Sequence, residues 1–466
     1  MWDSTDQLVR QSSLEPLNVL IDGYNLQMPG GTGIKTYTIS LIQALQYLGL
    51  KSLVLTGLPD SNDPVLSEVL LADERARQEM DLRQYLTLGG YGQAALKLLK
   101  YLVKLWCQQP HSLSLSDRVA FKNSPMSGLL QADHILNLEG CYETSRLLYS
   151  LFRQQTTIRC RQPIDLWHRT YPILPLKVPL RRPHANVVTI CDVIPLKLPY
   201  LTRDRKKDYY YTLKTVLQER PMVTTISEHS RQDILEFFDI DPDRICVTYL
   251  PIAPTPLTDE SHLCKEKYVA NPLENQQLLY FLQRYRLKPQ DYLLFVGTIE
   301  PRKNLSLLLK AYLALDSELP LVIVGKRGWR AEQDLDSLES MFGRYWYQRV
   351  KLLDFSTTHE LTYLYQGAFC LIFPSLYEGF GLPPLEAMSW GCPVISSDRS
   401  SLPEVCGDAA LYFNPYDAAE LQTKLTQLLN DSYLRHQLIQ RGIARAKQFN
   451  LDNFSQKLWH AYTQVL

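Results

Sequence analysis

The stretch LIFPSLYEGFGLPPLEAMSWGCPVISS, residues 371–397, decides the fold. Its opening apolar run predicts a buried strand, and Gly379 and Gly381 follow in a loop. Pro383–Pro384 suit the first turn of a helix, because proline there gives up no hydrogen bond within the helix. The helix is expected to end at Gly391, before a second strand. Such a strand–loop–helix–strand unit presents free backbone N–H groups at a helix start, which is where phosphate binds.

Two carboxylates, Glu378 and Glu386, flank this loop with seven residues between them. Carboxylates repel phosphate, so we assign them to neutral, hydroxyl-rich parts of the same ligand. A ligand with phosphates in its middle and hydroxyls at both ends is a sugar nucleotide. The alternative is a tight turn with a charged rim and no ligand.

Bulk composition indicates an ordinary globular protein. The 466 residues predict two or three domains, and 49 basic against 49 acidic residues give no case for nucleic acid. Nine scattered cysteines without a C-x-x-C pair argue against a disulfide framework or zinc site and fit a reducing cytosol. Residues 1–16 lack the apolar core of a signal peptide, and no apolar run approaches the roughly 20 residues of a membrane span. We therefore expect a cytoplasmic protein.

A second phosphate loop is predicted near the start of the chain. Residues 17–22 predict a strand, the loop GYNLQMPGGTG follows, and 34–48 has the apolar spacing of a helix. A strand, a glycine loop and a helix in this order can hold phosphate, although the glycines can also serve only to shape a turn. If this loop and the one at 300–304 share a ligand, it lies between two domains.

Residues 91–109, YGQAALKLLKYLVKLWCQQ, predict an amphipathic helix with three lysines on one side and leucine, valine and tryptophan on the other. We favour an ordinary domain helix with a solvated lysine face. Peripheral attachment to the inner face of a membrane stays the alternative, because basic amphipathic helices bind anionic lipid.

The second half of the chain alternates short apolar strands with helices, which predicts a parallel sheet covered on both faces. The strands are expected at 292–297, 320–325, 349–353, 369–373, 393–397 and 410–413. After the first of them comes GTIEPRKN, residues 297–304. Arg302 and Lys303 lie there at the carboxyl end of a strand, before a helix that Asn304 is expected to cap. Two cations in this place suit a diphosphate, and the alternative is a solvated basic turn.

The stretch EGFGLPPLE with the following GCPVISS resembles the E-x7-E signature of retaining GT-B glycosyltransferases of glycosyltransferase family 4. GTIEPRKN resembles the same family's G-T-x-E-x-R-K-N stretch. The resemblance implies an α/β fold of two Rossmann-like, doubly wound domains that face each other across a cleft. It places an acceptor-side domain at 17–270, a donor-side domain at 271–450, and a last helix at 451–466 that packs back towards the first domain.

The resemblance also implies roles for residues. Arg302 and Lys303 would hold and neutralise the diphosphate, Glu378 would accept hydrogen bonds from the sugar hydroxyls, and Glu386 from the ribose. The other residues expected to bind the nucleotide-sugar are Gly31, Gly33, Thr298, Phe380, Gly381 and Leu382.

The segment VVTICDVIP, residues 187–195, resembles the family's T-x-H-D-x-x-P segment. Asp192 matches and joins Glu378, Arg302 and Lys303 in the expected catalytic set. Cys191 stands where the family has histidine, and a cysteine cannot supply a cationic donor near neutral pH. His168 or His184 could approach the same place from another loop.

The expected activity is transfer of a hexosyl group from a nucleotide-sugar, GDP-mannose or a UDP-sugar, to a saccharide or lipid-linked acceptor with retention of configuration. The form of the motif favours bacterial mannosyltransferases of polysaccharide synthesis. We expect no metal and no cofactor, because the D-x-D pairs near 239–243 and 334–336 are interpreted as solvated surface. The alternatives are an impaired sugar-nucleotide-binding relative and a retaining glycoside hydrolase, which needs no basic diphosphate loop.

Overall fold

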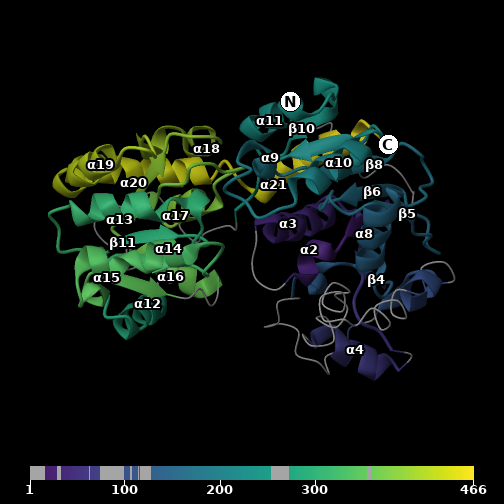
Figure 1. Cartoon of the computed structure of the whole chain (residues 1–466), viewed down its shortest axis with the longest axis horizontal. Coiled ribbons are helices and arrows are strands. Elements are labelled where there is room, and N and C mark those ends of the chain that lie inside the picture. Colours follow the sequence, from purple (N-terminus) through teal and green to yellow (C-terminus); the bar gives the residue numbers. More distant parts are fainter. Residues whose placement is uncertain are drawn as a thin grey trace. The chain divides into compact units, whose positions relative to one another are not determined.

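The computed structural model describes residues 16–28, 33–61, 63–73, 99–104, 108–113, 115, 127–252, 272–353 and 358–466. Contacts between Cα atoms divide the chain into two compact units (Figure 1). The first comprises Met1–Ile190, Tyr210–Thr224 and Ser455–Leu466, and the second Cys191–Tyr209 and Thr225–Phe454. The domain boundaries at 270 and 450 stay predictions.

The first unit is built on a parallel sheet with one antiparallel strand, β3, at its edge. In spatial order its strands are β9 (Met222–Thr225), β8 (Asn186–Thr189), β6 (Leu166–Arg169), β1 (Asn18–Asp22), β2 (Lys51–Thr56), β4 (His134–Asn137) and β3 (His111–Leu113). The helices of this part of the chain are α2 (Tyr24–Gln27), α3 (Gly33–Tyr47), α4 (Pro64–Ala72), α8 (Cys141–Phe152), α10 (Lys206–Leu217) and α21 (Leu451–Thr463). A separate pair, β5 (Thr156–Thr157) and β7 (Leu176–Lys177), is also parallel.

The second unit contains a sheet whose six strands are all parallel. Their order is β13 (Val350–Leu353), β12 (Leu321–Val324), β11 (Leu293–Val296), β14 (Cys370–Phe373), β15 (Val394–Ser397) and β16 (Ala410–Phe413). Each of the six predicted strands is confirmed to within one residue at either end. The sequence pattern sufficed because strands buried on both faces are continuous apolar runs.

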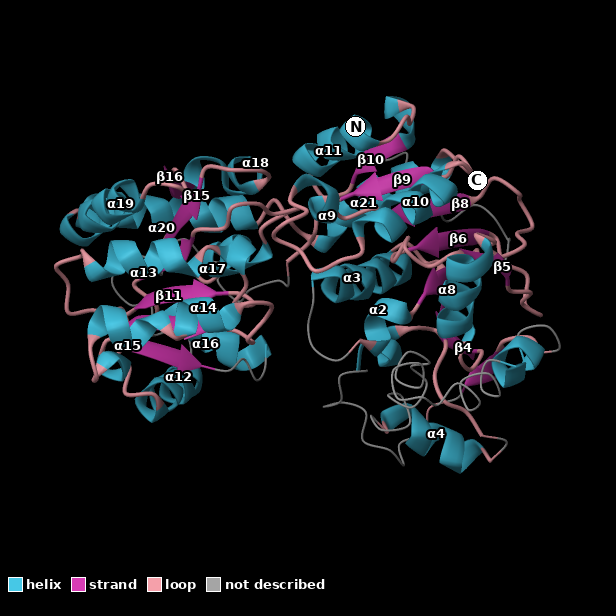
Figure 2. Cartoon of the chain, viewed as in Figure 1, coloured by secondary structure: helices cyan, strands magenta, loops and turns pink. Residues whose placement is uncertain are grey.

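Helices lie on both faces of this second sheet (Figure 2). They are α12 (Pro272–Arg284), α13 (Leu305–Leu313), α14 (Ala331–Leu335), α15 (Ser337–Phe342), α16 (Thr358–Gly367), α17 (Leu382–Ser389), α18 (Leu402–Cys406), α19 (Ala418–Asn430) and α20 (Ser432–Ala446). Contacts also assign to this unit α9 (Ile194–Lys197), α11 (Glu228–Phe237) and β10 (Ile245–Val247).

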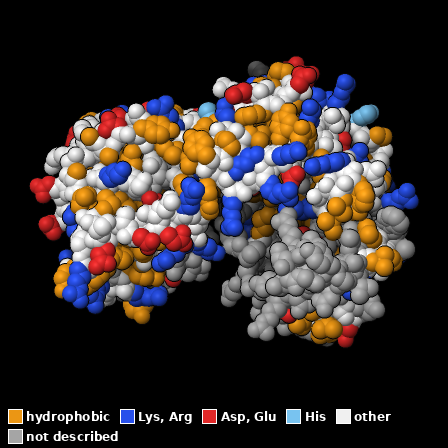
Figure 3. Space-filling view, in the orientation of Figure 1, with side chains coloured by type: hydrophobic (Ala, Val, Ile, Leu, Met, Phe, Trp, Pro, Cys, Tyr) orange, Lys and Arg blue, Asp and Glu red, His pale blue; other side chains and the backbone are white. Residues whose placement is uncertain are grey.

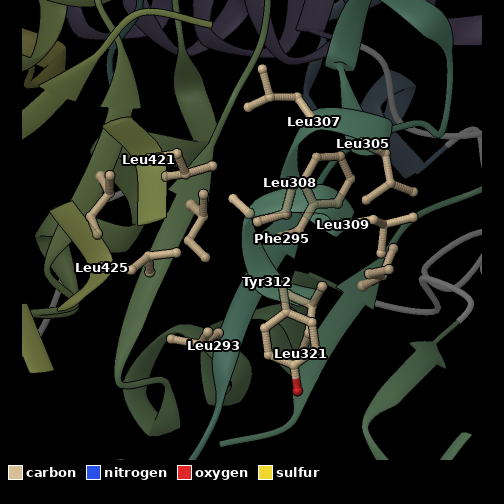
Figure 4. Packing of buried hydrophobic residues seen from close by; sticks show 14 of the residues in the cluster. Leu293, Phe295, Leu305, Leu307, Leu308, Leu309, Tyr312, Leu321, Leu421 and Leu425 are labelled. Atoms are coloured by element: carbon tan, nitrogen blue, oxygen red, sulfur yellow. The ribbon is translucent and has the colours of Figure 1, made fainter. Parts of the chain in front are cut away.

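One apolar cluster joins the second sheet to its helices. Leu308 and Tyr312 of α13 lie beside Phe295 of β11, with Leu421 and Leu425 of α19 next to them (Figure 4). All five side chains are buried. Burying a side chain of this size contributes roughly 1.5–3 kcal/mol, so the cluster fixes the strands whose ends carry the loops described below.

A buried polar network fastens the C-terminal residues within the first unit. The Nδ1 of His168 lies 2.7 Å from the hydroxyl of Tyr462 in α21, and its Nε2 lies 2.7 Å from that of Thr189. Thr189 in turn donates to the hydroxyl of Tyr37 in α3 at 2.8 Å. His168 is fully buried. His168 therefore lies in β6 with both ring nitrogens engaged rather than on a loop, whereas His184 is exposed on the loop before β8.

This network predicts an acid-sensitive first unit. Burial lowers the pKa of His168 to about 3, from 6.5 in an unfolded chain. Between those values the unfolded chain binds the extra proton, so His168 lowers the free energy of unfolding by up to about 1.4 kcal/mol for each pH unit of acidification below 6.5. Urea unfolding at a series of pH values should show this slope. The slope should decrease in His168→Asn, and an unchanged slope would contradict the assignment.

The predicted amphipathic helix is described only in part. Residues 99–104 are helical, while Lys97 and Trp106 lie outside the described residues. Leu99 and Val103 are exposed and Tyr101 is buried, and Lys104 pairs with Glu139. Among the described helices, none has the length and apolar character needed to cross a bilayer.

Candidate functional site: a cation pair at the ends of two strands

The two sequence motifs meet at the carboxyl edge of the second sheet. β11 and β14 are paired in register, Leu293 with Cys370 and Leu294 with Leu371. The loops that follow them therefore start side by side, as ligand-binding loops do in parallel sheets. The first loop forms the 3₁₀ turn η4 (Pro301–Lys303), and the N–H of Leu376 in the second donates to the carbonyl of Arg302 at 2.9 Å.

Glu378 holds both cations. Nη1 of Arg302 lies 2.7 Å from one carboxylate oxygen of Glu378, and Nζ of Lys303 lies 2.6 Å from the other. Arg302 also donates to the carbonyl of Tyr377 at 2.7 Å and to the carboxylate of Glu300 at 2.8 Å. Lys303 and Glu378 are buried, each 8% exposed, so these charges interact with little screening by water.

The charges change each group's protonation equilibrium. Burial alone would raise the pKa of Glu378, but Arg302 and Lys303 outweigh it and hold the pKa at about 2. Burial lowers the pKa of Lys303 in spite of the nearby Glu378 carboxylate. The Glu378 and Glu300 carboxylates raise the pKa of Arg302 against its own burial. At neutral pH we therefore assign a carboxylate to Glu378, a guanidinium cation to Arg302 and an ammonium cation to Lys303.

The loop after Tyr377 passes very close to Asp192. A Cβ added at Gly379 would lie 2.9 Å from the Cβ of Asp192 and 2.9 Å from its Oδ2, so only glycine fits without a shift. The carbonyl of Gly379 accepts hydrogen bonds from Ser227 at 2.8 Å and Ser230 at 3.1 Å. Burial raises the pKa of Asp192, whose Oδ1 accepts from the N–H of Ile194 at 3.0 Å. Asp192 thus lies beside the loop that the E-x7-E motif forms.

Cys191 precedes Asp192 and is half-buried. Burial raises the pKa of its thiol far above neutral pH. Cys191 is therefore a neutral thiol, and it supplies no cation where the family pattern has a histidine.

α17 begins directly at the loop. Gly381 precedes its first residue with φ of 119°, a conformation that favours glycine, and a Cβ there would lie 2.8 Å from Leu402. Proline occupies the first turn, as predicted. Ser401 donates to the carbonyls of Glu378 at 2.9 Å and Phe380 at 2.7 Å, and Phe380 is buried. These bonds turn the loop so that α17 starts at Leu382.

Glu386 lies one turn into α17 and is partly buried. The hydroxyl of Tyr365 donates to its Oε2 at 3.0 Å. Burial raises the pKa of Glu386, although the bond from Tyr365 opposes the rise. This carboxylate thus has one neutral donor, in contrast to Glu378 with its two cations.

The remaining predicted residues are placed as follows. Thr298 is exposed after β11, and Gly33 is exposed as the first residue of α3 in the first unit. Gly31 lies outside the described residues. Asn304 occupies the N-cap position of α13, as predicted, but its side chain makes no capping hydrogen bond and instead donates to the carbonyls of Pro374 at 3.1 Å and Pro415 at 2.7 Å.

Two side chains hold the start of α11, which begins at Glu228. Ser227 is its N-cap and accepts from the N–H of Ser230 at 3.0 Å. The carboxylate of Glu404 accepts from the N–H groups of Glu228 at 2.7 Å and His229 at 3.0 Å. No sequence pattern could indicate the contact of Glu404 with the start of α11, because the two lie far apart along the chain.

Sequence reasoning missed two groups that hold the cation pair. Glu300, two residues before Arg302 in the same motif, could have been suspected from its spacing. Tyr377 could not: its hydroxyl lies 2.7 Å from Nε2 of His229 and donates to Asp233, and both partners come from α11. Within the described ranges, no three His, Cys, Asp or Glu side chains are placed to share a metal ion.

Comparison with known proteins gives the family. The model of the family "Glycosyl transferases group 1" matches residues 283–445, which include both motifs. The O-antigen chain mannosyltransferase B of Escherichia coli is 36% identical over 281 residues, which is 59% of this chain and 69% of that protein. The serotype-specific mannosyltransferase WbdA of Escherichia coli is 29% identical over 290 residues, 60% of this chain but only 34% of WbdA.

Solved structures show the same fold at low identity. Anabaena Alr3699/HepE, solved in complex with UDP, has a TM-score of 0.58 at 13% identity and covers 96% of this chain and 100% of its own. WaaG, a glycosyltransferase involved in lipopolysaccharide biosynthesis, has a TM-score of 0.56 at 15% identity over 96% of this chain and 99% of its own. The predicted α/β GT-B fold with two Rossmann-like domains is confirmed. The chain belongs to the glycosyl transferases group 1 family and is a glycosyltransferase.

Proposed function

We propose that the protein transfers a mannosyl group from GDP-mannose to a saccharide acceptor in polysaccharide synthesis, with retention of configuration. The observation that carries the donor assignment is the pair of cations, the partly buried Arg302 and the buried Lys303, which lie after β11 and contact the loop after β14. Mannose is favoured by the relatives, two of which are mannosyltransferases by name. The same proposal includes an acceptor that is a saccharide or is linked to a lipid. It also includes a cytoplasmic location, with attachment to the inner face of a membrane.

The cation pair can bind a diphosphate while it still holds Glu378. Arg302 has five N–H donors and Lys303 has three, more than Glu378, Glu300 and the Tyr377 carbonyl engage. As the sugar leaves, negative charge grows on the diphosphate, and fixed cations stabilise that charge. The buried position strengthens the effect because little water screens it.

The other site residues surround the sugar and the ribose in this proposal. Glu378 accepts hydrogen bonds from sugar hydroxyls, with Asp192 beside the same loop, and the backbone of Phe380, Gly381 and Leu382 binds the sugar and the phosphate. Glu386 accepts from the ribose, and Thr298 completes the part of the donor site that the second unit provides. The roles of Gly31 and Gly33 stay predictions from the sequence. No metal is required, since Arg302 and Lys303 supply the neutralising charge.

The test is a thermal-shift titration with GDP, UDP, dTDP and ADP, each with and without EDTA. A nucleotide that binds only the folded protein should raise its free energy of unfolding by about 2.7 kcal/mol at 100 times Kd. We expect the largest shift with GDP and no effect of EDTA. A larger shift with UDP would change the donor, loss of the shift in EDTA would overturn the metal-free site, and no shift with any nucleotide would refute the donor site.

A further inference from the structure

Two tyrosines form an aromatic stack at the carboxyl edge of the first sheet. Tyr24 follows β1 and Tyr171 follows β6, and these two strands are neighbours in register. The ring centroids are 5.0 Å apart with 28° between the planes. Both side chains are partly exposed and pack with their inner sides on the core. Ligands of parallel α/β sheets bind at this edge.

Contacts of Gly23 and Tyr142 fix the position of Tyr24. Gly23 is packed so tightly that a Cβ there would lie 2.5 Å from the carbonyl oxygen of Leu55. Its N–H donates to the hydroxyl of Tyr142 at 3.1 Å, and the ring of Tyr142 meets that of Tyr24 edge-on with centroids 5.4 Å apart. These contacts hold the backbone of the turn from β1 to α2 and thereby fix the position of the Tyr24 side chain.

The position of Tyr171 is fixed by a buried carboxylate. Asp22, the last residue of β1, is 1% exposed and accepts from the N–H groups of Thr170 and Tyr171, the latter at 3.0 Å. The same strand end thus places both rings: Asp22 holds the backbone of Tyr171, and the next two residues are Gly23 and Tyr24. Rings held in this way lose little conformational entropy when a ligand binds.

An arginine lies at the rim of the stack. Nη1 of Arg146 in α8 donates to the hydroxyl of Tyr24 at 2.8 Å, and the guanidinium carbon lies 5.9 Å from the centre of that ring. Arg146 is partly exposed. A guanidinium has five donors in a planar fork, so Arg146 can bind hydroxyl oxygens beyond Tyr24.

We propose that Tyr24, Tyr171 and Arg146 form a saccharide subsite that takes one pyranose ring of the acceptor. The inference rests on the proposed mannosyl transfer. A pyranose presents C–H groups on its faces and hydroxyls around its edge. Aromatic faces carry partial negative charge that attracts C–H groups, while arginine donates to the hydroxyls. Hydrophobic, basic and acidic side chains are interspersed on the face of the molecule drawn in Figure 3.

The test measures binding of an α-linked mannotetraose by titration calorimetry, without donor. Tyr24→Ala and Tyr171→Ala should each weaken binding by roughly tenfold or more, since a lost aromatic contact removes both its area and its stacking. Tyr24→Phe keeps the ring, loses only the bond from Arg146, and should weaken binding about two- to threefold. Tyr433→Ala, at an exposed tyrosine of α20, is the matched control and should bind as the wild type does.

The outcomes separate this inference from the proposed function. Weak binding by both alanine variants, with the GDP thermal shift kept, supports the subsite. Equal binding by Tyr24→Ala, Tyr171→Ala and the wild type overturns it, as does no binding by the wild type. Saccharide binding that follows this pattern without any nucleotide shift would support the subsite and refute the donor site. A variant with a lowered unfolding temperature is replaced by Arg146→Gln, for which we expect a loss of about threefold.

Discussion

Arg302→Ala is expected to remove the nucleotide-dependent thermal shift and to lower kcat/KM by a factor of about 10²–10³. Removing one fixed donor from a site that stabilises developing negative charge costs about 3–4 kcal/mol. Arg302 has a further effect, because it donates to the Tyr377 carbonyl and thereby holds the loop that carries Glu378. The measurement is steady-state transfer with the donor that stabilises the protein, beside the thermal-shift titration.

Two variants make this result interpretable. Arg302→Lys keeps the charge but cannot make the bonds to Glu300, Tyr377 and Glu378 at once, so an intermediate loss is expected. Arg344→Ala removes an exposed arginine of the same unit and should leave kcat/KM unchanged. Wild-type activity and an undiminished nucleotide shift in Arg302→Ala would place the donor elsewhere.

The sheet of the second unit could be predicted from the sequence because its strands are short, fully apolar runs. Phe295 and its neighbours in β11 are all buried. A strand buried on both faces is a continuous run of apolar residues, which the sequence shows directly. Pro383 and Gly391 gave the limits of α17 through local backbone preferences alone. Local chemistry of this kind needs no knowledge of tertiary contacts.

The electrostatic arrangement of the site could not be predicted in the same way. Both motifs were found, but no sequence pattern indicated that Glu378 would lie between Arg302 and Lys303, more than 70 residues away along the chain. The same limit applies to Asn304, whose bonds to two distant carbonyls prevail over its preference for a cap. Partners set by the meeting of strand ends become visible only once the sheet order is known.

Glu378→Gln is expected to destabilise the protein by about 3–5 kcal/mol, because the buried Lys303 and the partly buried Arg302 lose the carboxylate that compensates them. In this variant Arg302 keeps its ion pair with Glu300, whereas Lys303 loses its ion pair with Glu378. Most of the lost stability is therefore expected from the uncompensated charge of Lys303. The measurement is the free energy of unfolding in urea at pH 7. Glu339→Gln, at an exposed glutamate of α15, is the control and should unfold as the wild type does.

The same variant separates a structural role of Glu378 from a role at the donor site. A nucleoside diphosphate can replace the missing negative charge, so its stabilisation should be larger in Glu378→Gln than in the wild type, while transfer from the nucleotide-sugar falls. The pKa of about 2 adds a pH dependence: the stability that Glu378 supplies is present above pH 4.5 and is lost as the pH falls towards 2, so the two proteins should converge in acid. Equal stability at pH 7 would show that the folded protein does not depend on Glu378 to compensate the two cations. Lower stability with a diphosphate shift no larger than in the wild type would show that the cation pair is a structural feature rather than a site whose charge is matched to a diphosphate.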